Sequence, residues 1–258
     1  MRPKGILPDS PWTLARLARV LVPHARLIGA TVAQPQPVDW AVGWSDQGGE
    51  ESCTGHGNAK MIFGTALAQG YAGARPDPHS IYALRAADYP ALPFSSPLPD
   101  EGASMATIVE GLAHFGCLAA GDGPPTTADR LDLAQLEAAQ GFRVPLVSRI
   151  ELAGEVLVEA CIAALARGCL SFAMMVDEGY ERLTNGQVWS GPSGKVLGGH
   201  CQAVDAWRQG TNGVEFKVAG SWGPQFGCIW MPAASFGQVA SDVYVGQVVP
   251  KLTITGVS

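Results

Sequence analysis

The chain has 258 residues and a mass of 26.9 kDa, enough to bury a sizeable core in one large domain or two small lobes. Apolar residues make up 47% of the chain and charged residues only 16%, which excludes disorder over most of its length. The formal net charge of −6 argues against a general nucleic-acid binder.

The first 36 residues differ from the rest in charge. Five Lys and Arg residues stand there against Asp9 alone, a net charge of +4. Ser10 and Pro11 precede apolar residues at helical spacing over 14–21, so we predict a short amphipathic helix that docks on its own domain or on a partner. We call residues 1–36 the basic arm.

The basic arm contains no continuous apolar run of the kind that a secretory signal needs. No run anywhere in the chain reaches the roughly 18 apolar residues of a membrane span. An Arg-rich, acid-poor start is also typical of a transit peptide. We expect no signal peptide, no membrane span, and a cytoplasmic or virion-associated protein.

The segment 37–143 has a mainly helical pattern. Apolar residues recur every three or four positions over 59–67, and Gly70 follows as a stop signal. Ser104 is a candidate N-cap for a second helix over 105–112. Shorter elements are predicted as well: a strand at 38–42 and helical pieces near 81–87 and 131–136.

The segment 144–258 is rich in strands after one helix predicted over 156–167. A helical half followed by a β-rich half indicates the α+β class, with two lobes that face each other within a domain spanning 37–258. The strands are predicted at 170–176, 200–207, 214–219, 228–231 and 243–249.

Six cysteines in this length do not make a disulfide-dense scaffold. No CxxC pair occurs, so we expect no structural zinc, and the sequence indicates no other metal and no cofactor. Each cysteine is expected to be a buried thiol unless its neighbours indicate otherwise.

Cys53 is the cysteine whose neighbours indicate otherwise. It follows a Gln-Gly-Gly-Glu-Glu-Ser loop and opens the first predicted helix, where free N–H groups and partial positive charge favour a thiolate. That is the setting of a nucleophile, although a buried cysteine at a helix start is the simpler interpretation. Gln47, six residues earlier, could add its side-chain amide to an oxyanion hole, although a glutamine before Gly-Gly is most often a loop residue.

His200 follows Gly198 and Gly199 where a β pattern begins, so we expect it exposed at a strand end, where a general acid or base is useful. A surface histidine is the alternative. Trp222 stands in Gly-Ser-Trp-Gly after another strand and reads as a packing lid or a core tryptophan at a turn. The four remaining histidines lack such settings, and we interpret His56 as structural.

These features follow one order along the chain: Gln loop, cysteine, Gly-Gly-His and Ser-Trp-Gly. In that order the sequence resembles the papain family of cysteine peptidases over roughly 37–250. DQGGEESCTGHGNA resembles the nucleophile segment and LTNGQVWSGPSGKVLGGHCQAVDAW the histidine segment. FKVAGSWGPQFGCIWMP resembles FxxxNSWGxxWGxxGY, and DEGASMATIVEGLAHFG resembles the substrate-loop-and-helix region of bacterial members.

The resemblance implies a helical left lobe (37–143), an antiparallel β-barrel-like right lobe (144–258) and an active-site cleft between them. Cys53 would be the thiolate nucleophile, and His200 its ion-pair partner and the acid for the leaving amine. Gln47 and the Cys53 N–H would hold the oxyanion, and Trp222 would shield the hydrogen bond that supports the histidine. The cleft would be lined by Glu101, Gly102 and Ala103 on one wall and by Gly198 and Gly199 on the other.

The sequence departs from the family at several positions. The asparagine that orients the histidine falls at Gly220, which has no side chain, so Ser221 or a water would have to substitute. Thr54 stands where a tryptophan usually follows the nucleophile. Glu50 replaces a cysteine, so that disulfide is absent, and Glu50 and Glu51 would raise the Cys53 pKa if they lie close. Only 36 residues precede the domain, where an inhibitory propeptide usually has about a hundred.

Two functions follow. The first is a cysteine peptidase that hydrolyses peptide or protein substrates, with amide hydrolysis in cell-wall peptides as a related chemistry. The alternative is a weak or inactive papain-like module that binds or builds within a larger assembly such as a phage particle. Gly220 and the basic arm, which could bind a protein partner, favour the alternative. The joint presence of Cys53, His200 and Gln47 favours the enzyme, and either protein would be bacterial or phage.

Overall fold

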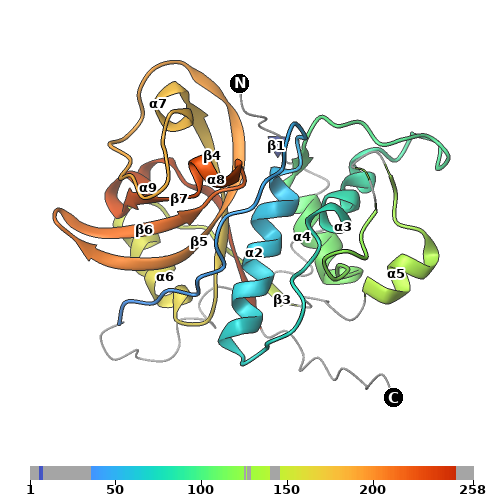
Figure 1. Ribbon diagram of the computed structural model, residues 1–258, viewed down its shortest axis with the longest axis horizontal. Coiled ribbons are helices and arrows are strands. Elements are labelled where there is room, and N and C mark those ends of the chain that lie inside the picture. Colours follow the sequence, from blue (N-terminus) through green and yellow to red (C-terminus); the bar gives the residue numbers. More distant parts are fainter. Residues whose placement is uncertain (1–5, 8–35, 125, 127–128, 140–145, 248–258) are drawn as a thin grey trace.

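The computed structural model describes residues 6–7, 36–124, 126, 129–139 and 146–247. The helices of the segment 37–143 gather on one side of the molecule, and the antiparallel sheet lies on the other side together with the helices of the segment 144–258 (Figure 1). The helices are α2 (Cys53–Ala68), α3 (Pro78–Ala83), the 3₁₀ helix η2 (Leu84–Asp88), α4 (Met105–His114), α5 (Leu133–Ala139), α6 (Gly154–Leu165), α7 (Glu178–Glu181), α8 (Gly223–Phe226) and α9 (Ala233–Val239). The strands are β1 (Ile6–Leu7), β2 (Ala103–Ser104), β3 (Leu146–Ile150), β4 (Leu170–Asp177), β5 (Val196–Gly210), β6 (Gly213–Ala219), β7 (Cys228–Pro232) and β8 (Ser241–Gln247).

The larger sheet has six strands in the order β3-β8-β4-β5-β6-β7, and every neighbouring pair in it is antiparallel. The long strand β5 lies inside this order, between β4 and β6. On one face, α6 and α9 cover a core that includes Phe172, Phe216 and Phe236. The rings of Phe172 and Phe216 each lie 4.9 Å from that of Phe236, so aromatic packing fixes this layer.

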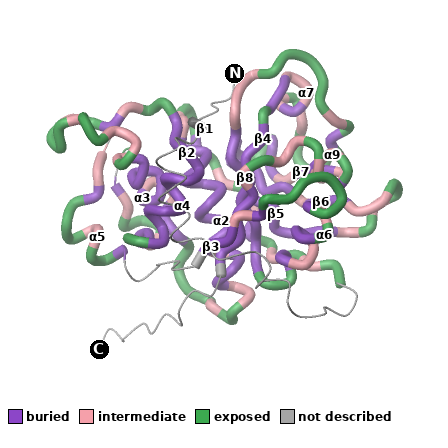
Figure 2. Tube along the Cα trace, turned by 180° about the vertical axis from the view of Figure 1, so that it is seen from behind, coloured by how far each residue is buried: buried purple, intermediate pink, exposed green. Residues whose placement is uncertain are grey.

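Helix α2 lies between the helical side and the sheet (Figure 1) and is buried around nearly its whole circumference (Figure 2). A helix without a polar face is the kind that a protein core encloses. Two of its glycines allow the helix to pack closely against Cys201 and Cys169. A Cβ at Gly57 would lie 2.5 Å from Cys201 Sγ, and one at Gly64 would lie 2.0 Å from Cys169 Sγ. Larger residues there would push the helix off β4 and β5.

Helices α3 and α4 are each capped by a side-chain hydrogen bond. Ser104 accepts from the Thr107 N–H at the start of α4, as predicted, and Asp77 accepts from the Ser80 N–H at the start of α3. A second core packs among α2, α3 and α4 and continues to β3 and β8. Its position between helices and sheet brings the start of α2 against β5.

The α+β fold and the five predicted strands are confirmed. The helices predicted over 59–67 and 105–112 are confirmed as α2 and α4. The strand predicted at 38–42 is wrong, because Asp39 makes only an isolated bridge to Ala206 and Ala41 and Gly43 have positive φ angles that break the extended chain. Strand β3 and the short helices α7, α8 and α9 were not predicted. The helix predicted over 14–21 lies outside the described residues.

Within the described ranges, no helix is long and apolar enough to cross a membrane. The same part of the chain holds no group of three or more His, Cys, Asp or Glu side chains arranged to bind a metal ion.

Candidate active site

Cys53 is the first residue of α2 and is fully buried. The backbone N–H of Cys201 on β5 donates a hydrogen bond to Cys53 Sγ across 3.4 Å. The position before that donor is His200. The fold therefore brings the cysteine at the helix start and the strand that carries the histidine into direct contact, across 148 residues of sequence.

His200 lies inside β5, opposite Met174 of β4, and is fully buried. The expectation of an exposed histidine at a strand end is wrong, because β5 begins earlier, at Val196, and an indole covers the ring. The rings of His200 and Trp222 are stacked with their centroids 4.1 Å apart and their planes at 23°. Trp222 thus has the lid position that its sequence neighbours predicted.

Gln47 is buried, and both ends of its side-chain amide are held. Its Oε1 accepts from the Ser221 hydroxyl at 2.7 Å, and its Nε2 donates to the Glu50 carbonyl at 2.6 Å. The Gln47 backbone N–H donates to the Ser221 carbonyl at 2.9 Å. These bonds fix which way the amide nitrogen faces. They also give the Ser221 hydroxyl a role on the glutamine rather than the predicted one on the histidine.

Gly220 stands where the resemblance places an asparagine, and Phe226 fills the space beside it. A Cβ at Gly220 would lie 2.3 Å from Phe226 Cδ1 and 2.9 Å from the Gly227 carbonyl oxygen. The φ angle of Gly220 is not positive, so the obstacles to a side chain there are the Phe226 ring and the Gly227 carbonyl, and not the backbone conformation of Gly220 itself. Phe226 is fully buried.

Phe226 belongs to an aromatic cluster under the histidine. Its ring meets that of Trp222 edge-on at 5.1 Å and that of Tyr180 at 5.5 Å, and Tyr180 meets Trp189 edge-on at 5.4 Å. Sequence reasoning did not single out Phe226, although it falls at the second tryptophan of the FxxxNSWGxxWGxxGY pattern. The sequence did offer a signal: Phe226 replaces a tryptophan of the family pattern in the same segment in which Gly220 replaces the asparagine.

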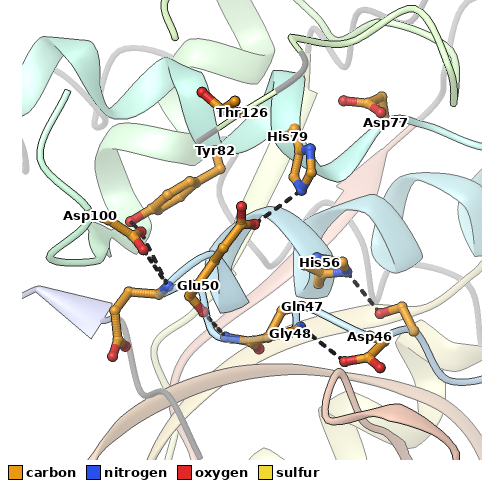
Figure 3. Close-up of polar contacts among 12 residues, drawn as sticks. Asp46, Gln47, Gly48, Glu50, His56, Asp77, His79, Tyr82, Asp100 and Thr126 are labelled. Carbon is orange, nitrogen blue, oxygen red and sulfur yellow. Dashed lines mark hydrogen bonds and ion pairs between the residues drawn. The ribbon is translucent and has the colours of Figure 1, made fainter. Parts of the chain in front are cut away.

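One proposed wall of the cleft is tied to the loop before Cys53 (Figure 3). The Gly102 N–H donates to the Tyr82 hydroxyl at 3.0 Å, which donates to Asp100 at 2.9 Å. The Glu51 N–H donates to the same carboxylate at 3.1 Å. Glu101 itself is exposed. Tyr82 and Asp100 were missed, and only the position of Asp100 next to Glu101 pointed to them.

The other proposed wall, Gly198 and Gly199, lies on β5 opposite Val176 and Met175. On the first wall, Ala103 and Ser104 form β2, which pairs in parallel with β1 from the basic arm. Strand β1 also contacts β5. The two described residues at the start of the arm therefore dock on this chain's own domain, beside Ala103.

A glutamate of the acidic loop before Cys53 is paired with a histidine (Figure 3). Glu50 Oε2 lies 3.1 Å from Nε2 of His79, on α3. The ring of His79 meets that of His56 edge-on at 6.4 Å. The Glu50 carboxylate is thus directed at α3.

All six cysteines are free thiols, so the disulfide predicted to be lost is indeed absent. Five are buried and Cys228 is partly exposed. Burial raises the pKa of Cys201 and of Cys169 well above the usual range, and it raises that of Cys228 to about 11. A raised pKa makes these three thiols poor nucleophiles, and of them Cys201 is the one that contacts Cys53.

Solved structures share this fold. Xylellain, a cysteine protease from Xylella fastidiosa, is similar over 97% of this chain and 98% of its own, with a TM-score of 0.72 and 21% identity. The ragweed pollen cysteine protease Amb a 11 in its proform is similar over 92% of this chain and 73% of its own, with a TM-score of 0.67 and 16% identity. Bromelain from Ananas comosus in complex with the E64 inhibitor is similar over 83% of this chain and 99% of its own, with a TM-score of 0.62 and 13% identity.

No family profile matches the sequence, and no curated protein sequence does either. The structural likeness, at identities of 21% and below, establishes the fold. The protein has the papain-like fold, with mixed helices and an antiparallel sheet. Xylellain shares it from end to end.

Proposed function

We propose that this protein is a papain-like cysteine peptidase, with Cys53 as nucleophile and His200 as its proton partner. The thiolate of Cys53 attacks the carbonyl carbon of the scissile peptide bond, and the imidazolium of His200 gives its proton to the leaving amine. A water then hydrolyses the thioester, passing one proton back through His200, and Cys53 is released as thiolate. The substrate is a peptide or protein.

Gln47 supports the tetrahedral intermediate in this proposal. Its Nε2 carries two hydrogens, and one is donated to the Glu50 carbonyl. The other, with the Cys53 backbone N–H at the start of α2, would stabilise the negative oxygen. Because the Ser221 hydroxyl holds Oε1, the amide need not reorganise when that charge develops.

The observation that carries the proposal is the 3.4 Å hydrogen bond from the Cys201 N–H to Cys53 Sγ. It brings a helix N-terminus, a thiol and the strand of a histidine together, and the partial positive charge of the helix N-terminus and a neighbouring imidazolium both favour the thiolate. The stacked indole of Trp222 limits rotation of the His200 ring. Substrate would bind between 101–103 and 198–199, which are proposed walls.

The basic arm bears on this reaction. A substrate strand that pairs with Ala103 must displace β1, which pairs there in the full chain. Breaking β1 in the variant Ile6→Pro/Leu7→Pro removes the one backbone N–H that a two-residue parallel strand can donate to β2, and we expect hydrolysis to rise about fivefold, given about 0.5–1.5 kcal/mol for the bond lost.

A second candidate is a papain-like module of low activity with a structural or binding role, in the cytoplasm or in a virion. Two observations favour it: Gly220 supplies no side chain to the histidine, and Cys53 and His200 are both fully buried. In that case the basic arm, 1–36, would be the surface that binds a protein partner.

Hydrolysis of a broad peptide library by the full chain, Cys53→Ala and the β1 variant distinguishes the two candidates. The peptidase proposal predicts cleavage that Cys53→Ala abolishes and that the β1 variant increases. Equal background rates in all three folded proteins would refute the peptidase and leave the module. Circular dichroism of each variant verifies folding.

A further inference from the structure

A small cavity lies on the side of α2 that faces the segments 44–45 and 75–78, apart from the cysteine and histidine. Its volume is about 150 Å³. Its walls include the aromatic rings of Trp44 and Phe63 and the side chains of Pro76, Pro78 and two alanines. The engineered apolar cavity that binds benzene has about this volume. The cavity can therefore hold a single aromatic ring.

A buried amine lines this largely apolar space. Lys60 is 5% exposed, and its Nζ donates to the Ser45 hydroxyl oxygen at 2.7 Å. Burial lowers the Lys60 pKa to about 8, against attraction from Asp205 and nearby thiols. An ammonium has three hydrogens to donate, and a neutral hydroxyl does not compensate its charge.

The Ser45 hydroxyl links Lys60 to His56, a buried histidine one turn earlier in α2. His56 Nδ1 lies 2.9 Å from Ser45 Oγ (Figure 3). An ammonium can only donate, so the Ser45 hydroxyl oxygen accepts from Lys60. Burial, with Lys60 and His79 nearby, lowers the His56 pKa well below its usual range. Within the described residues, the buried Nε2 of His56 has no hydrogen-bond partner.

The charge of the lining has one sign. Lys60 and Arg75 line the cavity together with His56, and none of the residues that line it is Asp or Glu. Arg75 donates to the Val42 carbonyl at 2.7 Å and lies over the Phe63 ring, so its charge is also uncompensated by a carboxylate there. Asp46 and Asp77 adjoin lining residues in the sequence, but their carboxylates accept from the Gly48 and Ser80 N–H groups. Glu50 is paired with His79. Cations at an apolar cavity select an anion with an apolar body.

We propose that this cavity is a binding site for a small aromatic monocarboxylate, with the ring against Trp44 and Phe63 and the carboxylate toward Lys60 and Arg75. The site lies behind the loop that carries Gln47. The Ser45 N–H donates to the Gly220 carbonyl and the Ser45 carbonyl accepts from the Gly223 N–H, so the cavity and the Trp222 turn share one segment of backbone. The proposal concerns binding and does not depend on peptidase activity.

Benzoate tests the proposal, with benzyl alcohol and benzylamine as neutral and cationic probes of similar size. We expect benzoate to raise the melting temperature of the full chain and to quench tryptophan fluorescence with a saturable dissociation constant. Benzyl alcohol should bind at least tenfold more weakly, because it forms no charge-assisted hydrogen bond. Benzylamine should not bind.

Lys60→Met is the matched variant, because it keeps the length of the side chain and removes its charge. It should weaken benzoate binding at least tenfold, while Lys195→Met, at an exposed lysine, should leave it unchanged. Arg75→Gln gives a second measurement if Lys60→Met fails to fold, and it should weaken binding several-fold. Equal binding of benzoate and benzyl alcohol, or full retention of benzoate binding in these variants, overturns the proposal.

A spectroscopic readout locates the charge contact. In protein with ¹³C-methylated lysines, saturating benzoate should move the titration midpoint of Lys60 upward, because an anion stabilises the ammonium. Benzyl alcohol should not move it upward. A Lys60 signal that benzoate leaves unchanged, while it binds elsewhere as an adventitious additive only, also overturns the proposal.

Discussion

The two halves of the candidate site are built in different ways. Gln47 is held by directed hydrogen bonds from Ser221 and to Glu50, each with one donor and one acceptor. His200 lies against a stacked indole, and Phe226 fills the volume where an orienting amide would be. The oxyanion half is a polar scaffold, and the imidazole half is an aromatic one.

The contrast teaches how each half responds to mutation. A hydrogen bond depends on one atom, so its removal changes the orientation of one group with little change in packing. An aromatic stack depends on shape, so its members can be replaced only where volume is conserved. Activity should therefore fail sharply on the Gln47 side, whereas activity and stability should fail together on the His200 side.

Gln47→Ala should give the largest loss. It removes the proposed oxyanion donor, which is worth roughly 100- to 1000-fold in kcat. Peptide hydrolysis by the folded variant measures the loss. Gln187→Ala is the matched control, because Gln187 is an exposed glutamine that bonds only locally, to the Thr184 N–H, through its side chain. A Gln47→Ala enzyme with unchanged kcat would contradict the polar half of the comparison.

Trp222→Leu should come next, with kcat reduced about 10- to 100-fold and KM changed less. Without the indole, the His200 ring samples other angles, and the basic limb of the pH–rate profile, on which the imidazolium of the ion pair loses its proton, should shift. Trp230→Leu serves as the control, because Trp230 is a tryptophan of β7 whose ring packs against the Arg208 guanidinium. If the two variants lose the same activity with unchanged pH profiles, the loss reflects packing alone.

A double-mutant cycle at Gly220 and Phe226 tests the exchange of amide for ring. Gly220→Asn should destabilise the fold by about 1–3 kcal/mol, because its Cβ overlaps the Phe226 ring. In combination with Phe226→Ala the two changes should couple by about 1–2 kcal/mol in the stabilising direction, since the side chain enters the vacated space. Urea unfolding of the four proteins measures this, and additive free energies would show that the two positions do not compete.

Ser221→Ala should have the smallest effect. Losing the hydroxyl leaves Gln47 Oε1 without its donor, at about 1 kcal/mol, and kcat should fall roughly fivefold with KM unchanged. Ser241→Ala is the control: it removes a hydroxyl on β8 that donates to the Ala173 carbonyl on β4, and it should leave kcat unchanged. A Ser221→Ala loss as large as that of Trp222→Leu would mean that the hydroxyl acts on the histidine after all.

The sequence predicted the fold well because its signals are local and strong. Ser104 caps its helix as its residue type suggests, and the apolar positions after Cys53 do form a helix. The strand expected at 38–42 failed because Ala41 adopts a positive φ angle, which propensity does not anticipate for alanine.

The residues of the candidate site were predictable, but their surroundings were not. Ordered motifs pointed to Cys53 and His200, and the fold brings Cys53 into contact with Cys201, the residue that follows His200 on β5. The burial of His200, the collision between Gly220 and Phe226, and the bond from Ser221 to Gln47 all join segments distant in sequence or depend on side-chain packing. One sequence alone carries no record of which distant side chains touch.

The rate at which iodoacetamide alkylates Cys53, mapped by mass spectrometry from pH 5 to pH 9, tests the central claim most directly. The other five cysteines serve as internal references. If His200 stabilises a thiolate at Cys53, the full chain should label Cys53 at pH 6, far below the range in which an ordinary thiol ionises, and at least tenfold faster than folded His200→Ala. Identical rates in the two proteins across the whole range would contradict a Cys53–His200 pair.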